Sequence, residues 1–124
     1  MGRLRIDRLT GPPRPLLDDR GRVVAARCYP ATTAPARLVS LLATPDLADD
    51  EALWLAPCSS VHAVGLRARV GCAFVDGEGV VLRVLDPLPT FARARGAAAV
   101  VECAAGTLDG VVPGRRLLLG SVSP

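Results

Sequence analysis

The sequence contains no lysine, asparagine or glutamine, and its aromatic residues are limited to one Trp, one Tyr and two Phe. So few rings exclude a deep aromatic ligand cage, and the core has to be packed from Val, Leu and Ala. All 15 basic residues are arginine, which is typical of a genome-wide compositional bias. The number of arginines therefore says little about the partners of the protein.

Long apolar runs are also missing, and the longest extend over about five residues, as at 97–101. A secretory signal needs roughly 7–15 apolar residues, and a membrane-spanning helix needs about 20. We therefore expect a cytoplasmic protein without a membrane span. The four cysteines would pair as disulfides only in an exported protein, so reduced thiols are expected.

The cysteines include no Cys-x-x-Cys pair, so the sequence has neither a zinc ribbon nor a thioredoxin motif. A metal site made from Cys58, His62, Cys72 and Cys103 would have ligand types that suit zinc. Its spacing, however, is unlike that of a closed structural site, and three separate elements would have to converge. The sequence predicts no metal and no cofactor.

The chain of 124 residues, half of them hydrophobic, suits one domain with a core of ordinary size. Residues 1–15 are rich in Arg and Pro and have too little apolar content to form a packed element, which predicts a flexible N-terminal arm. The globular domain is expected at 16–120, followed by a short tail at 121–124.

The clearest strand signal is the alternation over Leu66–Val75, in which Cys72 and Phe74 face one side. An alternation of this length predicts a half-buried strand. Asp76–Gly79 favours a tight turn, so an antiparallel hairpin with a returning strand at 80–85 is expected. Shorter strand signals are found at 16–17, 23–29, 52–56, 98–103 and 115–119.

One helix is expected after residue 32, where Thr33 can cap its start. Leu38, Leu41 and Leu42 then fall on one face at the spacing i, i+3 and i+4. The order of elements favours the α+β class. We expect a compact β-rich barrel or sandwich of about six or seven short, mostly antiparallel strands with one clear helix.

Four segments, in this order and spacing, resemble the bacterial and archaeal family called domain of unknown function 192. They are Pro57-Cys58-Ser59-Ser60-Val61-His62, then Leu66-Arg67, then Cys72-Ala73-Phe74-Val75-Asp76-Gly77-Glu78-Gly79-Val80-Val81, and Glu102-Cys103-Ala104-Ala105-Gly106-Thr107. The resemblance covers roughly Leu16 to Leu119. It implies a small β-rich α+β fold and no established activity, so it supplies a fold without a mechanism.

The chain departs from the family pattern at several positions, including the following four. Ala63 and Leu66 stand where the family favours Thr and Met, and Gly71 stands where it commonly has a carboxylate. Arg115 replaces the Asp of a Gly-Asp pair near the C-terminus. The resemblance therefore does not imply, for this chain, any family role that needs those side chains.

The Cys58–Leu66 loop is the most motif-like segment outside the expected core. Loops on a rigid sheet often carry binding residues, so we expect a non-catalytic binding or accessory protein with an unknown protein or small molecule as partner. The expected contact residues are Ser59, Ser60, His62, Arg67 and Arg69.

The alternative is a small enzyme in which Cys58 is the nucleophile and His62 the base, because a reactive thiol needs such a neighbour. Against this, a cysteine after a buried strand is usually a small apolar filler, and a lone turn histidine is usually structural. We therefore lean against catalysis.

Nucleic acid is not expected as a partner. The arginines of the N-terminal arm suit phosphate contacts, but stacking aromatics are missing and the rest of the chain is close to neutral.

Overall fold

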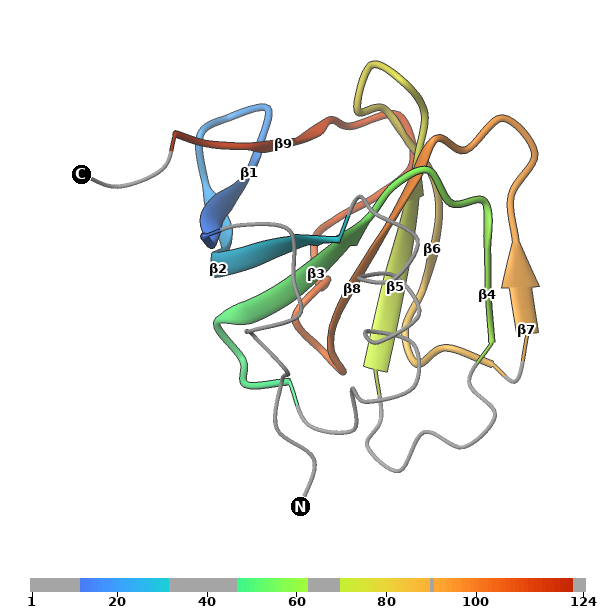
Figure 1. Ribbon diagram of the computed structural model, residues 1–124, viewed down its shortest axis with the longest axis horizontal. Helices are drawn as coiled ribbons and strands as arrows, with labels where there is room; N and C mark the ends of the chain where they lie inside the picture. The colour runs from blue at the N-terminus through green and yellow to red at the C-terminus, as the bar shows by residue number, and fades with distance from the viewer. Residues whose placement is uncertain (1–11, 32–46, 63–69, 90, 122–124) are drawn as a thin grey trace.

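The computed structural model describes residues 12–31, 47–62, 70–89 and 91–121, and nine strands lie within them (Figure 1). The strands are β1 (Arg14–Asp18), β2 (Val23–Ala31), β3 (Glu51–Leu55), β4 (Ser60–His62), β5 (Val70–Val75), β6 (Val81–Leu85), β7 (Phe91–Arg93), β8 (Ala99–Ala104) and β9 (Leu117–Leu119). Seven form one sheet in the order β6-β5-β8-β3-β2-β1-β9, and β4 pairs with β7 in a second sheet. The β2–β3 pair is parallel and the other pairs between these strands are antiparallel.

The expected α+β class is wrong, because the described residues contain no helix and are organised entirely by β-strands. The helix expected from Thr33 to Leu42 lies outside the described residues. The strand count also exceeds the expected six or seven, because β4 and β7 have three residues each. A strand of that length shows no readable alternation in the sequence. Within the described part of the chain, no helix is long and apolar enough to cross a membrane.

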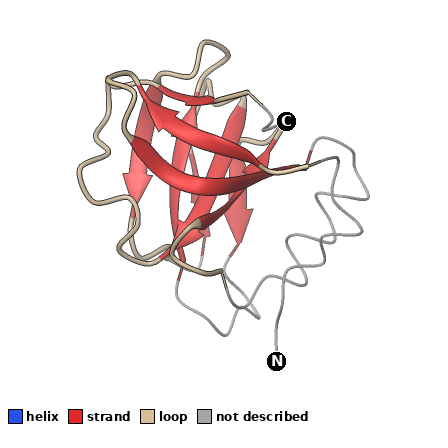
Figure 2. Ribbon diagram, turned by 90° about the vertical axis from the view of Figure 1, so that its left-hand side faces the viewer, coloured by secondary structure: helices blue, strands red, loops and turns tan. Residues whose placement is uncertain are grey.

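The large sheet curls until its two edge strands, β6 and β9, meet at one end (Figures 1 and 2). The amide of Val81 donates to the carbonyl of Arg115 at 2.7 Å, and the amide of Leu117 donates to the carbonyl of Gly79 at 2.9 Å. These bonds satisfy backbone groups that an open edge would leave exposed to pairing with another chain.

The β5–β6 hairpin confirms the expected turn at Asp76–Gly79. The Asp76 carboxylate accepts the amides of Glu78 at 2.9 Å and Val80 at 3.0 Å, and Gly79 has a φ of +85°. A Cβ at Gly79 would lie 2.6 Å from the carbonyl oxygen of Leu117. Glycine is therefore needed both for the turn and for the close approach that joins the two edges.

The core has a large cluster on one face of the curled sheet, which includes Leu16, Val81, Val101 and Leu117. A second cluster lies on the other face of β5 and β8 and includes Val61 of β4 and Ala92 of β7. The small β4–β7 sheet thus packs on the face of the large sheet that the first cluster leaves open.

Strand β5 is buried along its whole length, so the expectation of a half-buried strand is wrong for Val70–Val75. Cys72 and Phe74 are fully buried as expected, but Ala73 and Val75 on the opposite face are buried too. The physical reason is that apolar clusters cover both faces. The first half of the expected strand, 66–69, lies outside the described residues.

At the N-terminus, β1 begins at Arg14, two residues before the expected domain boundary. Residues 1–11 of the expected flexible arm lie outside the described residues. The side chain of Arg14 donates to the carbonyl of Gly120 at 2.5 Å.

Candidate functional site

The segment expected to be a loop from Cys58 to Leu66 begins as a turn and continues as strand β4. The amide of Cys58 donates to the carbonyl of Ala98 at 3.1 Å, and its thiol lies 3.1 Å from the carbonyl oxygen of Ser60. The half-buried Cys58 side chain also packs against the cluster that contains Phe74. These contacts describe a small packing residue whose thiol proton is held by a backbone carbonyl.

Two of the expected binding residues, Ser59 and Ser60, lie together beside strand β7. Ser60 is opposite Arg93 in the β4–β7 register, and the amide of Ala94 donates to the carbonyl of Ser59 at 3.1 Å. An open hollow of about 330 Å³ lies here, which we call the β4–β7 hollow. It is lined by Ser59, Ser60, Phe91, Arg93, Ala94, Arg95, Gly96 and Ala97.

The β4–β7 hollow combines three kinds of contact group. Ser59 and Ser60 contribute hydroxyls, Arg93 and Arg95 contribute guanidinium groups, and Phe91 contributes an aromatic ring. Phe91 is 46 % exposed, which is unusual for one of only two phenylalanines in the chain. The expected site therefore gains three residues, Phe91, Arg93 and Arg95, that no sequence motif indicated.

The other expected site residues are only partly described. His62 is the last residue of β4, and its backbone is opposite Phe91. Arg67 and Arg69, together with the departures at Ala63 and Leu66, lie outside the described residues. The pairing of Cys58 with His62 and the roles of Arg67 and Arg69 stay predictions.

A buried carboxyl group that the sequence analysis did not single out lies at the centre of the large sheet. Glu102 of β8 is 2 % exposed and stands in register between Leu53 of β3 and Cys72 of β5. Its Oε2 atom has no hydrogen-bond partner among the described residues. Burial raises the pKa of Glu102 to about 7. The feature of the sequence that could have indicated this residue is its position, because Glu102 is the one acidic residue within the apolar stretch 97–104.

The three other cysteines are buried and surrounded by apolar groups. Burial, with a smaller contribution from the Glu102 carboxylate, raises the pKa of Cys72 to about 12. The pKa of Cys103 is raised to about 12 for the same reasons. A thiol with so high a pKa is protonated at neutral pH and is a poor nucleophile. Within the described ranges, no three His, Cys, Asp or Glu side chains are placed to hold a metal ion.

Comparison with known proteins gives a likeness of structure alone. No family model and no curated protein matches the sequence. A candidate transcription regulator from Sinorhizobium meliloti 1021 superposes with a TM-score of 0.73 at 20% identity, over 90% of this chain and 95% of that one. A protein of unknown function from Novosphingobium aromaticivorans DSM 12444 superposes with a TM-score of 0.70 at 18% identity, over 95% and 99% of the two chains.

At these identities the two structures share the fold with this protein and assign it no function. The resemblance to domain of unknown function 192 stays a prediction.

Proposed function

We propose that the protein is a non-catalytic binding domain that contacts its partner through the β4–β7 hollow. The observation that carries this proposal is the convergence of Ser59 and Ser60 with Phe91, Arg93 and Arg95 on one open surface. Aromatic residues, including Phe, and arginine are enriched at protein interfaces relative to the rest of the protein surface.

The hollow also has a firm base. Val61 and Ala92, at the middle of β4 and β7, are 1 % and 3 % exposed and belong to one apolar cluster with Phe74. Side chains held on strands packed in this way keep their positions before a partner arrives, which lowers the entropy lost on binding.

The lining defines the partner by its chemistry. Guanidinium groups favour a carboxylate or another anion, and the ring of Phe91 favours an apolar group next to it. The proposed partner is therefore a protein segment or small molecule that presents an acidic group beside an apolar one.

The proposal is tested by native co-purification and mass spectrometry with the intact protein and two variants. Phe91→Ala and Arg93→Ala should each lose the bound species, whereas Leu118→Ala, which alters an exposed apolar residue on β9, should retain it. A species that all three proteins retain equally would place the binding surface elsewhere.

The alternative proposal, an enzyme that uses Cys58 and His62, is weakened by the contact between the Cys58 thiol and the Ser60 carbonyl. A hydrogen bond from the thiol favours its neutral form over the nucleophilic thiolate. Labelling with iodoacetamide at pH 7 separates the two proposals. An enzyme requires Cys58 to react far faster than glutathione, and a rate close to that of glutathione supports the binding domain.

We further propose the cytoplasm as the compartment of this protein, supported by four cysteines that are all present as thiols. Fractionation of cells that express the tagged protein tests this directly.

A further inference from the structure

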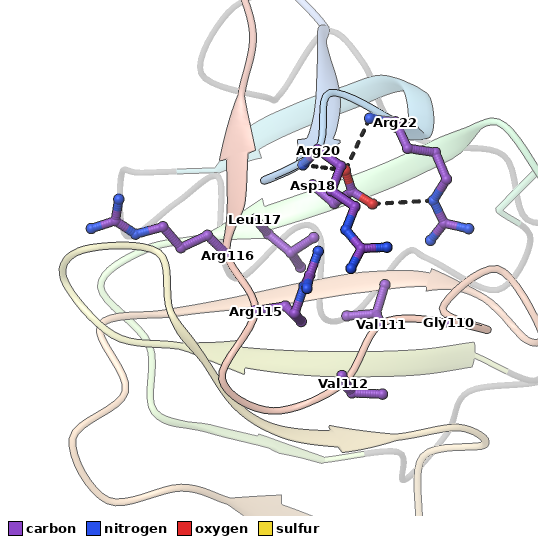
Figure 3. Close-up of a pocket in the computed structure, with 9 residues that line it drawn as sticks. All are labelled: Asp18, Arg20, Arg22, Gly110, Val111, Val112, Arg115, Arg116 and Leu117. Atoms are coloured by element: carbon purple, nitrogen blue, oxygen red, sulfur yellow. Dashed lines mark hydrogen bonds and ion pairs between the residues drawn. The ribbon is translucent and has the colours of Figure 1, made fainter.

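A second cavity lies at the end of the molecule where the curled sheet closes, and it is independent of the β4–β7 hollow. It has a volume of about 360 Å³ and is walled by the β1–β2 turn on one side and by the segment before β9 on the other. Arg20, Arg22 and Arg115 line it together with Asp18, Val111 and Leu117 (Figure 3).

The guanidinium groups converge from two distant parts of the chain. Figure 3 shows Arg20 reaching from the β1–β2 turn toward Arg115, which extends toward it from the opposite wall, with Arg22 beside them. Arg116 is on the rim, and its side chain is directed away from the cavity.

Positive charge exceeds negative charge in this cavity. Asp18 pairs with Arg22 at 3.2 Å and Asp19 pairs with Arg115 at 2.7 Å. For Arg20 there is no acidic partner among the described residues. Three converging guanidinium groups thus face two carboxylates, and the remaining positive charge favours an anion.

The arginine-bearing turn is held in place before any ligand binds. The Asp18 carboxylate accepts the amides of Arg20 and Arg22, both at 2.9 Å. Burial opposes ionisation of Asp18, but these amide bonds together with the Arg22 side chain outweigh it and lower its pKa. Gly21, with a φ of +82°, allows the tight bend between the two arginines.

The wall between the arginines is apolar. Val111 and Leu117 are 6 % and 1 % exposed and form its base, and the neighbouring Val112 is 50 % exposed. A ligand that uses the whole cavity must therefore carry an anionic group and a small apolar body.

We propose that this cavity binds a small phosphomonoester. Its phosphate would lie between Arg20 and Arg115, and its organic group would lie against Val111 and Val112. A phosphomonoester carries close to two negative charges at neutral pH, which suits several arginines better than a single carboxylate does. Guanidinium groups bind phosphate oxygens in a forked, bidentate manner. Arg115 brings one of these groups into the cavity from the segment before β9.

Phenyl phosphate is a suitable probe, titrated into the full chain by calorimetry in a phosphate-free buffer at fixed ionic strength. We expect saturable binding at one site. Arg20→Ala and Arg115→Ala should each weaken binding by about tenfold or more, because a charge-assisted contact to phosphate is lost. The affinity of Arg20→Lys for phenyl phosphate should lie between that of the alanine variants and that of the unaltered protein. Lysine keeps the positive charge but cannot make the bidentate contact of a guanidinium group.

Arg116→Ala is the matched control, because it removes an arginine of the same segment whose side chain is directed away from the cavity, and it should leave phenyl phosphate binding unchanged. Arg20 has no ion pair with a described residue, so its replacement by Ala should leave the melting temperature unchanged and separates binding from folding. Absent or non-saturable binding, or equal binding by Arg20→Ala, would overturn the proposal. Tight binding of a DNA oligonucleotide without binding of phenyl phosphate would also overturn it and assign the arginines to nucleic acid.

Discussion

Replacement of Glu102 by Gln should change how the stability of the protein depends on pH. The substitution keeps the size of the side chain and removes its ionisable group from the centre of the sheet. Burial raises the pKa of Glu102 from 4.5 to about 7 in the folded protein, and each unit of pKa corresponds to about 1.4 kcal/mol. The ionised carboxylate should therefore destabilise the fold by roughly 3 kcal/mol above pH 7.

The direction in which stability changes with pH follows from protonation of Glu102 in the folded chain and in the unfolded chain. Below pH 4.5 the carboxyl group is protonated in both the folded and the unfolded chain, and it contributes no pH dependence. Between 4.5 and about 7 the unfolded chain releases the proton and the folded chain retains it, so stability falls as the pH rises. Above about 7 both states are ionised and the loss is complete. Glu102→Gln should lack this loss.

Urea unfolding at pH 5, 6, 7 and 8 measures the effect as the difference in unfolding free energy between the unaltered protein and Glu102→Gln. The buried amide has its own unsatisfied donors, so the change of this difference with pH is the decisive quantity. Glu78→Gln is the control, because Glu78 is 78 % exposed and should show no such change. A difference that is constant from pH 5 to pH 8 would refute the reasoning.

Three further substitutions test the packing. Phe74→Ala should lower the unfolding free energy by about 3–5 kcal/mol, because removal of the fully buried ring leaves a cavity. Urea unfolding measures this loss, and a value below about 1 kcal/mol would contradict the burial of Phe74. Gly71→Ala should cost about 1–3 kcal/mol, because its Cβ would lie 2.7 Å from Cγ of Asp86; Gly77→Ala, with open space around it, is the control in the same assay. Gly79→Ala should speed hydrogen exchange of the Leu117 amide, which donates to the Gly79 carbonyl; unchanged exchange would show that the edges tolerate a side chain there.

The parts of the fold that the sequence predicted are those set by neighbouring residues. The turn at Asp76–Gly79 depends on residues that bond within the turn itself, and the burial of Cys72 and Phe74 follows from alternation in one strand. The sequence failed where distant segments decide the outcome. The unbroken apolar run Val70–Val75 is compatible with burial of both faces, but nothing in it indicates that the β4–β7 sheet covers one of them.

The candidate site also combines residues that a local sequence pattern indicates with residues that only the pairing of distant segments brings together. Ser59 and Ser60 could be proposed from the sequence because they belong to a motif, whereas Phe91 and Arg93 reach the same hollow through pairing of β4 with β7. The structure has no room for a side chain at Gly71, because the carboxyl group of Asp86 occupies the adjacent space. Its Oδ2 accepts the amide of Gly106 at 2.8 Å. No local pattern connects residues 71, 86 and 106, so this arrangement was not predictable.

The pairing of the first strand of the sheet with the last has a consequence for how the chain folds. Leu16 of β1 is opposite Leu119 of β9, a separation on the order of 100 residues, and domains rich in such contacts fold in milliseconds to seconds rather than microseconds. Until β9 arrives, one edge of β1 and the apolar interior beneath it remain open to other chains. On the ribosome, the sheet therefore cannot be completed before β9 has emerged, and a chaperone that shields β1 during this interval would raise the yield of folded protein.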